Sequence, residues 1–236
     1  MRSEKGSICE QHKTAIKNEV VETAIEGVSQ AIISLVPFVG ELINSTLPNI
    51  YSASKKSQFN DFIQSLNKSL KDQQFSEDKF TELTRKLDDP ETYKYLSTII
   101  DSVFFSKSNR ARAILGIITA NYFSSESLPY EDLVIINALK ELLDDEIKAF
   151  ESIYEVAIGG GREDPNGVGA FYFSYYPENV IANTTFSKSL HLGIFGNKAN
   201  WLTSKSPASW HGNVTSITKK LKYYINLANQ NSRSDT

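Results

Sequence analysis

The spacing of apolar residues is helical over the first two thirds of the chain, and this limits the fold more than any other feature. Phe59, Phe62, Ile63, Leu66 and Leu70 recur at intervals of three and four residues, so they share one face of a helix. Similar stripes follow up to about residue 158, separated by short polar links. The pattern predicts a mainly α protein with about seven helices packed as an antiparallel bundle.

Polar residues mark where several of these helices should begin. Asp89 followed by Pro90 is a strong start signal, because an N-cap carboxylate accepts backbone N–H bonds and proline loses none in the first turn. Ser76 is predicted to cap the helix that precedes the one starting at Asp89, and Asp144 is predicted to cap a later helix. The residues expected to face inward are Phe80, Leu83 and Leu87; Tyr93, Leu96, Ile99, Ile100, Val103 and Phe104; Leu133, Ile136, Leu139, Leu142 and Leu143; and Ile147, Phe150, Ile153 and Tyr154.

The sequence changes character at the stretch "IGGGREDPNGVGAFYFSYYPENV". Five of the twelve glycines fall between Gly159 and Gly169, which favours a loop or linker. We therefore expect a flexible N-terminus over 1–12, a helical domain over 13–158 and a Gly-rich loop over 159–169. A C-terminal subdomain over 170–228 and a flexible tail over 229–236 complete the predicted organisation.

The C-terminal segment is predicted to mix strands with helices. The stretch "AFYFSYY" is aromatic and strand-prone, and a short helix after it should end near Gly193. The stretch "NKANWLTSKSPASWHGNV" is typical of a two-stranded wing with a Ser-Pro turn. A closing helix should start at Thr215 or Ser216. This order is compatible with a small α+β subdomain of winged-helix-like type. The closing helix should bury Ile217, Leu221, Tyr224, Ile225 and Ala228.

Size and composition indicate a full core without covalent cross-links. With 236 residues, of which 40% are hydrophobic, the chain can bury a sizeable core. Cys9 is the single cysteine of the sequence, so neither an intramolecular disulfide nor a thiolate metal cluster can form. The sequence has no apolar core of signal-peptide length, and no run reaches the roughly 18 apolar residues of a spanning helix. We therefore expect a cytoplasmic protein.

The most apolar stretch is "AIISLVPFVGELI", residues 31–43, which is interrupted in its middle by Pro37 and Gly40. Each arm is too short to span a bilayer core of roughly 30 Å at about 1.5 Å of rise per residue. We expect this hairpin to lie in the core at rest, and its conditional release to a membrane is left open. The hairpin residues concerned are Val36, Pro37, Phe38, Val39 and Gly40.

Charge is distributed unevenly along the chain. From Asn179 onward there are seven basic residues and one acidic residue, which leaves 18 basic and 27 acidic residues before it out of totals of 25 and 28. A basic end of this kind suggests contact with nucleic acid, an anionic membrane surface or an acidic protein face. The alternatives are docking on the chain's own acidic body, or pairing between subunits of an oligomer. The candidate anion-binding residues are Lys188, His191, Lys198, Lys205, Lys219, Lys220 and Lys222.

Enzymatic interpretations find little support in the sequence. His191 and His211 have no Asp or Glu between them to complete a metal site or orient an imidazole. The glycine run from Gly159 lacks the Gly-Lys-Ser/Thr ending of a phosphate-binding loop. We therefore expect no catalytic residue, no metal, no cofactor and no small-molecule substrate.

An arginine cluster, Arg110 to Arg112, opens one of the predicted helices. Two cations are unfavourable at a helix N-terminus, where the helix dipole is positive. A carboxylate partner is therefore expected, either Asp101 or a residue elsewhere in the chain, and an internal salt bridge is the simpler interpretation.

The order of these segments resembles the Abi-alpha abortive-infection family and related phage-defence or prophage proteins of bacteria. The resemblance rests on "AIISLVPFVGELINSTLPNIY", then "SKSNRARAILGIITANYF", then "YEDLVIINALKELLDDEIKAFESIYE", and last the basic tail with "SLHLGIFG". It covers most of residues 20 to 225 and implies a helical bacterial protein with a winged-helix-like end. It brings no catalytic residues with it.

Two functions follow as hypotheses. The first is a non-enzymatic phage-defence protein of abortive-infection type that acts by binding another protein or a second copy of itself, with conditional membrane activity of the 31–51 hairpin. The second is a nucleic-acid-binding regulatory module that acts through the basic C-terminal end and whose affinity falls steeply with salt.

Overall fold

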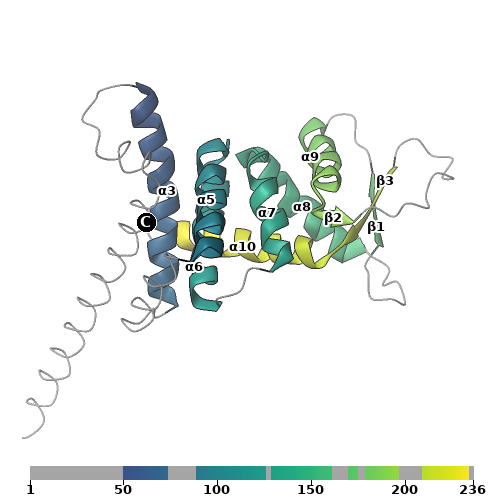
Figure 1. Ribbon diagram of the computed structural model, residues 1–236. Helices are drawn as coiled ribbons and strands as arrows, with labels where there is room; N and C mark the ends of the chain where they lie inside the picture. Colours follow the sequence, from purple (N-terminus) through teal and green to yellow (C-terminus); the bar gives the residue numbers. More distant parts are fainter. Residues whose placement is uncertain are drawn as a thin grey trace, which may run out of the picture.

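The computed structural model describes residues 50–73, 89–125, 129–160, 170–174, 179–196 and 209–233. Within these ranges the chain forms seven helices and three short strands (Figure 1). The predicted class, a mainly α bundle with a small C-terminal α+β part, is confirmed. The hairpin residues Val36 to Gly40, the predicted cap Ser76, and Lys198 and Lys205 lie outside the described residues.

Five helices form the body of the bundle. They are α3 (Ile50–Asp72), α5 (Pro90–Phe105), α6 (Asn109–Ser125), α7 (Tyr130–Leu139) and α8 (Asp144–Gly160). In Figure 1 the helices α3, α5 and α7 stand in a row, and the last helix, α10 (Ser216–Arg233), crosses this row. Helix α10 contacts α3, α6, α7 and α8. The last described helix therefore packs against helices from much earlier in the sequence.

Helix α5 begins as its sequence predicts. The backbone N–H of Thr92 donates to the Oδ2 of Asp89 at 2.9 Å, and Pro90 occupies the first turn. The carboxylate therefore satisfies one of the N–H groups that a helix start leaves without a partner.

The segment from Tyr130 to Leu143 differs from its predicted single stripe. Helix α7 ends at Leu139, and the chain turns where Glu141 N–H donates to the carbonyl of Ala138 at 3.0 Å. Leu133, within α7, and Leu143, after the turn, are 37% and 44% exposed instead of buried. The buried apolar residues of this segment are Ile135, Ile136, Ala138, Leu139 and Leu142.

Asp144, predicted to cap its own helix, serves another one. Its carboxylate accepts hydrogen bonds from Ser108 Oγ at 2.5 Å and from the backbone N–H of Arg110 at 3.0 Å. These donors stand at the start of α6, so Asp144 caps α6. The start of α8 is satisfied instead by Glu146, whose Oε2 accepts the backbone N–H of Leu143 at 2.8 Å.

The C-terminal part forms a small sheet flanked by two helices. It comprises β1 (Ala170–Ser174), α9 (Val180–His191), β2 (Phe195–Gly196), β3 (Ser209–Val214) and α10. The strand order is β1-β3-β2 and both pairings are antiparallel. Of the stretch predicted as a two-stranded wing, 197–214, the structure describes only β3, which pairs with β1 on one side and β2 on the other. The residues between β2 and β3, 197–208, lie outside the described residues.

Both predicted helix boundaries in this part are confirmed. Helix α9 ends before Gly193, which has a φ of +73°, and Ile194 N–H donates back to the carbonyl of Ser189 at 2.9 Å. This left-handed position favours glycine. Helix α10 begins after Thr215, which exchanges backbone and side-chain hydrogen bonds with Thr218 at 2.9 and 3.2 Å.

The predicted glycine loop starts too early, because α8 continues through Gly159 to Gly160. Residues 161–169 lie outside the described residues. Helix α8 therefore reaches two residues into the segment that its glycines mark as a loop. Glycine lowers helix stability by about 1 kcal/mol relative to alanine, a cost that a helix end can bear.

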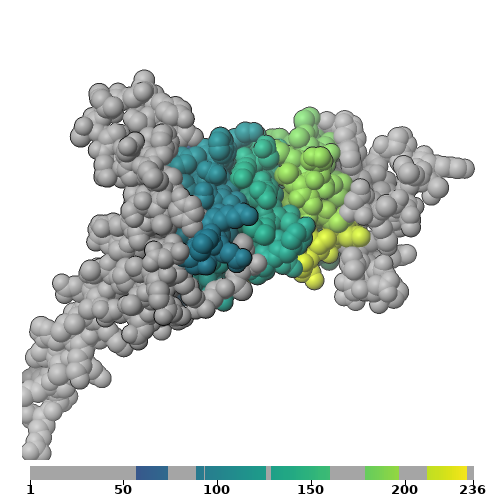
Figure 2. Space-filling model, viewed as in Figure 1, coloured from purple at the N-terminus to yellow at the C-terminus, as the bar shows by residue number. Residues whose placement is uncertain are grey.

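One hydrophobic core joins the helical body to the C-terminal part. The ring of Phe195 in β2 lies 5.4 Å from that of Phe150 in α8 and 5.5 Å from that of Phe186 in α9. Tyr224 and Ile225 of α10 are buried in the same cluster. Figure 2 shows the described residues of α5 to α9 as a continuous block. The predicted units 13–158 and 170–228 thus share a core where the structure describes them.

Helices α3 and α6 pack closely at a glycine. A Cβ on Gly116 would lie 2.6 Å from the carbonyl oxygen of Phe62 and 2.8 Å from the backbone nitrogen of Leu66. Ser65 Oγ donates to the carbonyl of Ala113 at 2.7 Å across the same contact. The small residues of α6 therefore set the distance between these two helices.

Across the described ranges, no helix has the length and apolar character that crossing a bilayer would require.

Candidate functional site

Three of the candidate anion-binding lysines form ion pairs with acidic residues of the helical body. Lys220 of α10 donates from Nζ to Oδ2 of Asp132 in α7 at 2.9 Å. The side chain of Asp132 is 7% exposed, so this pair is largely shielded from water and from salt screening.

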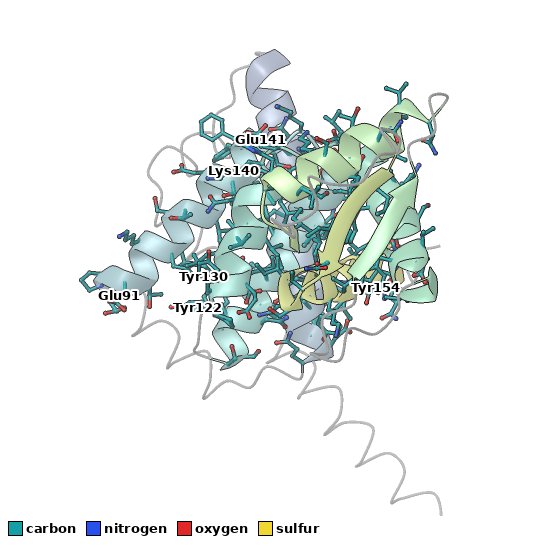
Figure 3. The ribbon with its side chains drawn as sticks, turned by 90° about the vertical axis from the view of Figure 1, so that its right-hand side faces the viewer. Glu91, Tyr122, Tyr130, Lys140, Glu141 and Tyr154 are labelled. Carbon is teal, nitrogen blue, oxygen red and sulfur yellow. The ribbon has the colours of Figure 1, made fainter. Side chains whose placement is uncertain are left out.

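Lys222, two residues further along α10, binds α8. Its Nζ lies 3.2 Å from Oε1 of Glu151 and 3.3 Å from Oε1 of Glu155. The same ammonium lies 5.9 Å from the ring centre of Tyr154, within the range of a cation–π contact. Figure 3 shows Tyr154 beside the strands and α10.

Lys188 of α9 binds the N-terminal end of α8. Its Nζ donates to Oε2 of Glu146 at 2.8 Å and to the carbonyl of Glu141 at 2.6 Å. In Figure 3, Lys140 and Glu141 mark the turn after α7, and Tyr130 marks the start of that helix. Lys188 therefore joins α9 to both the turn and the start of α8.

The remaining candidates of the basic end form no ion pair within the residues that the structure describes. His191 and Lys219 are exposed, and Lys198 and Lys205 lie outside the described residues. For Lys188, Lys220 and Lys222 the structure matches the alternative in which the basic end docks on the chain's own acidic body.

Asp132 is also the centre of a buried tyrosine cluster. Tyr224 donates its phenolic hydrogen to Oδ1 of Asp132 at 2.9 Å. Burial, followed by the charge of Asp132, raises the pKa of Tyr95 and of Tyr224. The hydroxyl of Tyr95 is buried without a hydrogen-bond partner among the described residues, and its ring lies 4.3 Å from that of Tyr122. The cluster holds α5, α6, α7 and α10 together.

The arginine cluster has its partners inside the chain. Arg112, which is 5% exposed, donates from Nε to Oδ2 of Asp61 at 3.3 Å. Arg110 lies 3.4 Å from Oε2 of Glu151. The expected internal salt bridges are therefore present, and their acidic partners are Asp61 and Glu151 rather than Asp101.

A cleft opens where α3, α6, α8 and α10 meet. Its volume is about 640 Å³, within the range of ligand-binding sites in proteins. Its charged groups are balanced, because Lys68 and Arg110 stand against Asp61 and Glu151. The lining residues are Asp61, Gln64, Ser65, Lys68, Asn109, Arg110, Ala113, Glu151, Ala228, Asn229, Asn231 and Ser232.

Glu151 is the residue through which the cleft and the basic end are connected. One carboxylate accepts from Arg110 of α6, from Lys222 of α10 and from Asn229 Nδ2, the last at 3.2 Å. The wall of the cleft and the position of α10 therefore depend on the same group.

Among the described residues, no three His, Cys, Asp or Glu side chains are placed to hold a metal ion.

Comparisons of the chain with protein-family models, with curated proteins and with solved structures find no match.

Sequence reasoning missed the cleft as a site. Its lining comes from four helices spread between Asp61 and Ser232, so no local spacing contains it. The one local signal was the pair Arg110 and Arg112, whose need for carboxylate partners pointed to contact with distant elements.

Proposed function

We propose that this chain is a non-catalytic binding protein of bacterial phage defence, and that it acts through contact between its cleft and a partner protein. The observation that carries the proposal is the open polar cleft at the junction of α3, α6, α8 and α10. Because helices from both ends of the described chain form its walls, a partner bound there would contact the body and the C-terminal helix together. The defence role rests on the family resemblance of the sequence.

The carboxylates of the cleft are held by cations of the same chain. Asp61 accepts from Arg112, and Glu151 accepts from both Arg110 and Lys222. Both carboxylates are thus already engaged in ion pairs within the chain. These side chains are therefore suited to fixing the shape of a surface.

The alternative of nucleic-acid binding through the basic end has less support. Phosphate binding requires lysines that can give up their present partners at little cost. Lys220 and Lys222 would each have to leave a carboxylate at 2.9 or 3.2 Å. Lys219 is the exposed candidate lysine within the described residues, and one lysine neutralises little of a nucleic-acid backbone.

The test is a phage challenge of bacteria with and without the gene. Gln64→Trp and Ser232→Trp would fill the cleft from α3 and α10 without removing an ion pair, and Asn137→Trp on the exposed side of α7 is the matched control. We expect the gene to reduce plaque formation, the two cleft variants to lose this protection, and the control to keep it. Thermal melts of each protein establish that the variants are folded.

Two outcomes would contradict the proposal. If a broad phage panel plates equally well with and without the gene, the defence role is wrong. If the cleft variants fold and protect as well as the natural sequence, the cleft is not the working surface.

Membrane activity of the hairpin stays a prediction, because residues 31–49 lie outside the described residues. Leakage of dye from liposomes of anionic lipid measures it. The companion measurement is the toxicity of the protein to the bacteria that express it. Absence of leakage, together with equal toxicity of the natural sequence and Phe38→Asp, would remove this part of the hypothesis.

A further inference from the structure

Two hydroxyl groups of α9 are buried without a hydrogen-bond partner among the described residues. They belong to Thr185 and Ser189, both of which are 0% exposed. A buried hydroxyl in a helix usually donates to the carbonyl one turn earlier, as Thr119 of α6 does to Leu115 at 2.8 Å. A buried polar group without a partner carries the full free-energy cost of its lost hydration. These two hydroxyls therefore weaken the docked position of α9.

Few elements hold α9 in place. Within the described ranges it packs mainly against α8 and against β2, the strand that directly follows it (Figure 1). The two large apolar side chains of its first turn, Val180 and Ile181, are exposed. Its attachments include the ring of Phe186, 5.5 Å from that of Phe195, and the ion pair of Lys188 with α8. Helix α9 can therefore leave without separating any two of the other helices.

We propose that α9 is a detachable lid, which leaves α8 and β2 as one unit while the other described helices stay packed. Its departure lets water reach the hydroxyls of Thr185 and Ser189, which favours the open state, and it uncovers the ring of Phe195. A helix of 12 residues is marginally stable alone in water, so detached α9 loses its backbone hydrogen bonds. Other elements line the cleft, so the inference does not depend on the proposed function.

The test is amide hydrogen exchange of the full chain, measured by mass spectrometry of peptides from α9 and from α6. Elements that open locally exchange faster than elements that open only when the whole chain unfolds. Rates are compared with those of the same peptides in an unstructured state. We expect the amides of α9 to lose at least about tenfold more protection than the buried amides of α6.

Two valine substitutions distinguish detachment of α9 from global unfolding. Valine resembles threonine in shape and has a similar helix propensity, so each substitution tests one hydroxyl. Thr119→Val removes a satisfied hydrogen bond from α6, which stays packed when α9 detaches. It should speed exchange in α6 by about fivefold and leave exchange in α9 unchanged. Thr185→Val removes an unsatisfied hydroxyl and should slow exchange in α9 by about tenfold.

A second matched pair keeps the test open if a valine variant does not fold. Ser102 of α5 is also 0% exposed, but its Oγ donates to the carbonyl of Thr98 at 2.6 Å. Alanine raises helix propensity alike in Ser102→Ala and Ser189→Ala. Ser189→Ala should slow exchange in α9, and Ser102→Ala should leave it unchanged.

Two results would overturn the inference. If Thr119→Val speeds exchange in α9 as much as in α6, then α9 opens only when the whole chain unfolds. If neither Thr185→Val nor Ser189→Ala slows exchange in α9, its hydroxyls do not weaken the docked position, as when an ordered water satisfies them.

Discussion

At the scale of single residues, Asp132 shows how a buried charge is accommodated. It is shielded by α10, and its two oxygens are divided between Tyr224 and Lys220. Burial of a carboxylate is unfavourable unless hydrogen bonds and a counter-charge compensate for the lost water. The sequence suggests Lys220 as a residue for an external anion, because a lysine on an amphipathic helix does not reveal which distant carboxylate faces it.

Replacing this carboxylate should cost more than replacing an exposed one. Asp132→Asn leaves Lys220 without its counter-charge in a site that is mostly buried, so we expect the free energy of unfolding to fall by about 2–3 kcal/mol. Tyr224→Phe, which removes one hydrogen bond, should cost about 1 kcal/mol. Urea denaturation measures both. The control is Lys107→Met, which breaks the ion pair of Lys107 with Glu141, whose side chains are 58% and 53% exposed. A fall in the free energy of unfolding above about 1 kcal/mol in this control would contradict the prediction.

Asp144 should contribute to the pH dependence of stability. Burial alone would raise its pKa, but hydrogen bonds from Ser108, Arg110 and Asn109 outweigh it and hold the pKa below the ordinary value of 3.8. The folded state thus favours the ionised form. This stabilisation is present above the ordinary value and is lost as pH falls through the lower, folded pKa.

Asp144→Asn should therefore be less sensitive to acid than the natural sequence. We expect its free energy of unfolding to decrease less steeply below about pH 4, as followed by urea denaturation at a series of pH values. Asp145→Asn removes the neighbouring exposed carboxylate, which caps no helix, and is the matched control. Equal slopes for Asp144→Asn and the natural sequence would show that the α6 cap does not discriminate between ionised and protonated carboxyl groups.

At the scale of elements, the sequence predicted the helices that carry their own boundary signals. Asp89 with Pro90 and Thr215 with Thr218 each satisfy backbone groups within three residues, so the boundary is encoded locally. The end of α7 was missed because no glycine or proline marks it, and Leu139, Leu142 and Leu143 continue a helical spacing through the turn. The role of Asp144 was missed because its donors lie 34 to 36 residues away.

The contact between α3 and α6 gives a prediction at this scale. Gly116→Ala would place a methyl group 2.6 Å from a backbone oxygen and 2.8 Å from a backbone nitrogen of α3. Backbone atoms cannot move aside like a side chain, so the helices must separate. We expect a loss of about 1–3 kcal/mol in the free energy of unfolding, measured by urea denaturation.

Gly159→Ala is the matched control for this substitution. Gly159 also lies in a helix, but a Cβ there would meet no atom within 4 Å. Alanine should therefore stabilise the protein by up to about 1 kcal/mol through its higher helix propensity. Equal effects of the two substitutions would contradict close packing at Gly116.

At the scale of the whole molecule, the basic end holds the fold together where the structure describes it. Lys188 joins α9 to α8, Lys220 joins α10 to α7, and Lys222 joins α10 to α8. The charge asymmetry of the sequence suggests an external anion, and for these three lysines the structure shows internal carboxylates, which was the alternative interpretation. Composition alone could not decide whether the acidic groups belong to a partner or to the same chain, since both would select the same residues.

This arrangement predicts different effects for two neighbouring lysines. Lys222→Met should lower the free energy of unfolding by about 1–3 kcal/mol, because Glu151 then loses one of its two cations in a partly buried site. Lys219→Met, at an exposed position, should change it by less than about 0.5 kcal/mol. Gel-shift assays with DNA and RNA at low salt accompany the denaturation curves. Binding that is lost in Lys219→Met without a change in stability would favour the nucleic-acid function instead.

The distance along the chain between Asp132 and Lys220, 88 residues, also has a consequence for synthesis. A ribosome adds about 5–20 residues per second, so a growing chain holds the acidic site of α7 for several seconds before its counter-charge has been made. Throughout that interval the earlier helices cannot close over Asp132 in their final arrangement. A chain cut short before α10 would keep this carboxylate without its counter-charge.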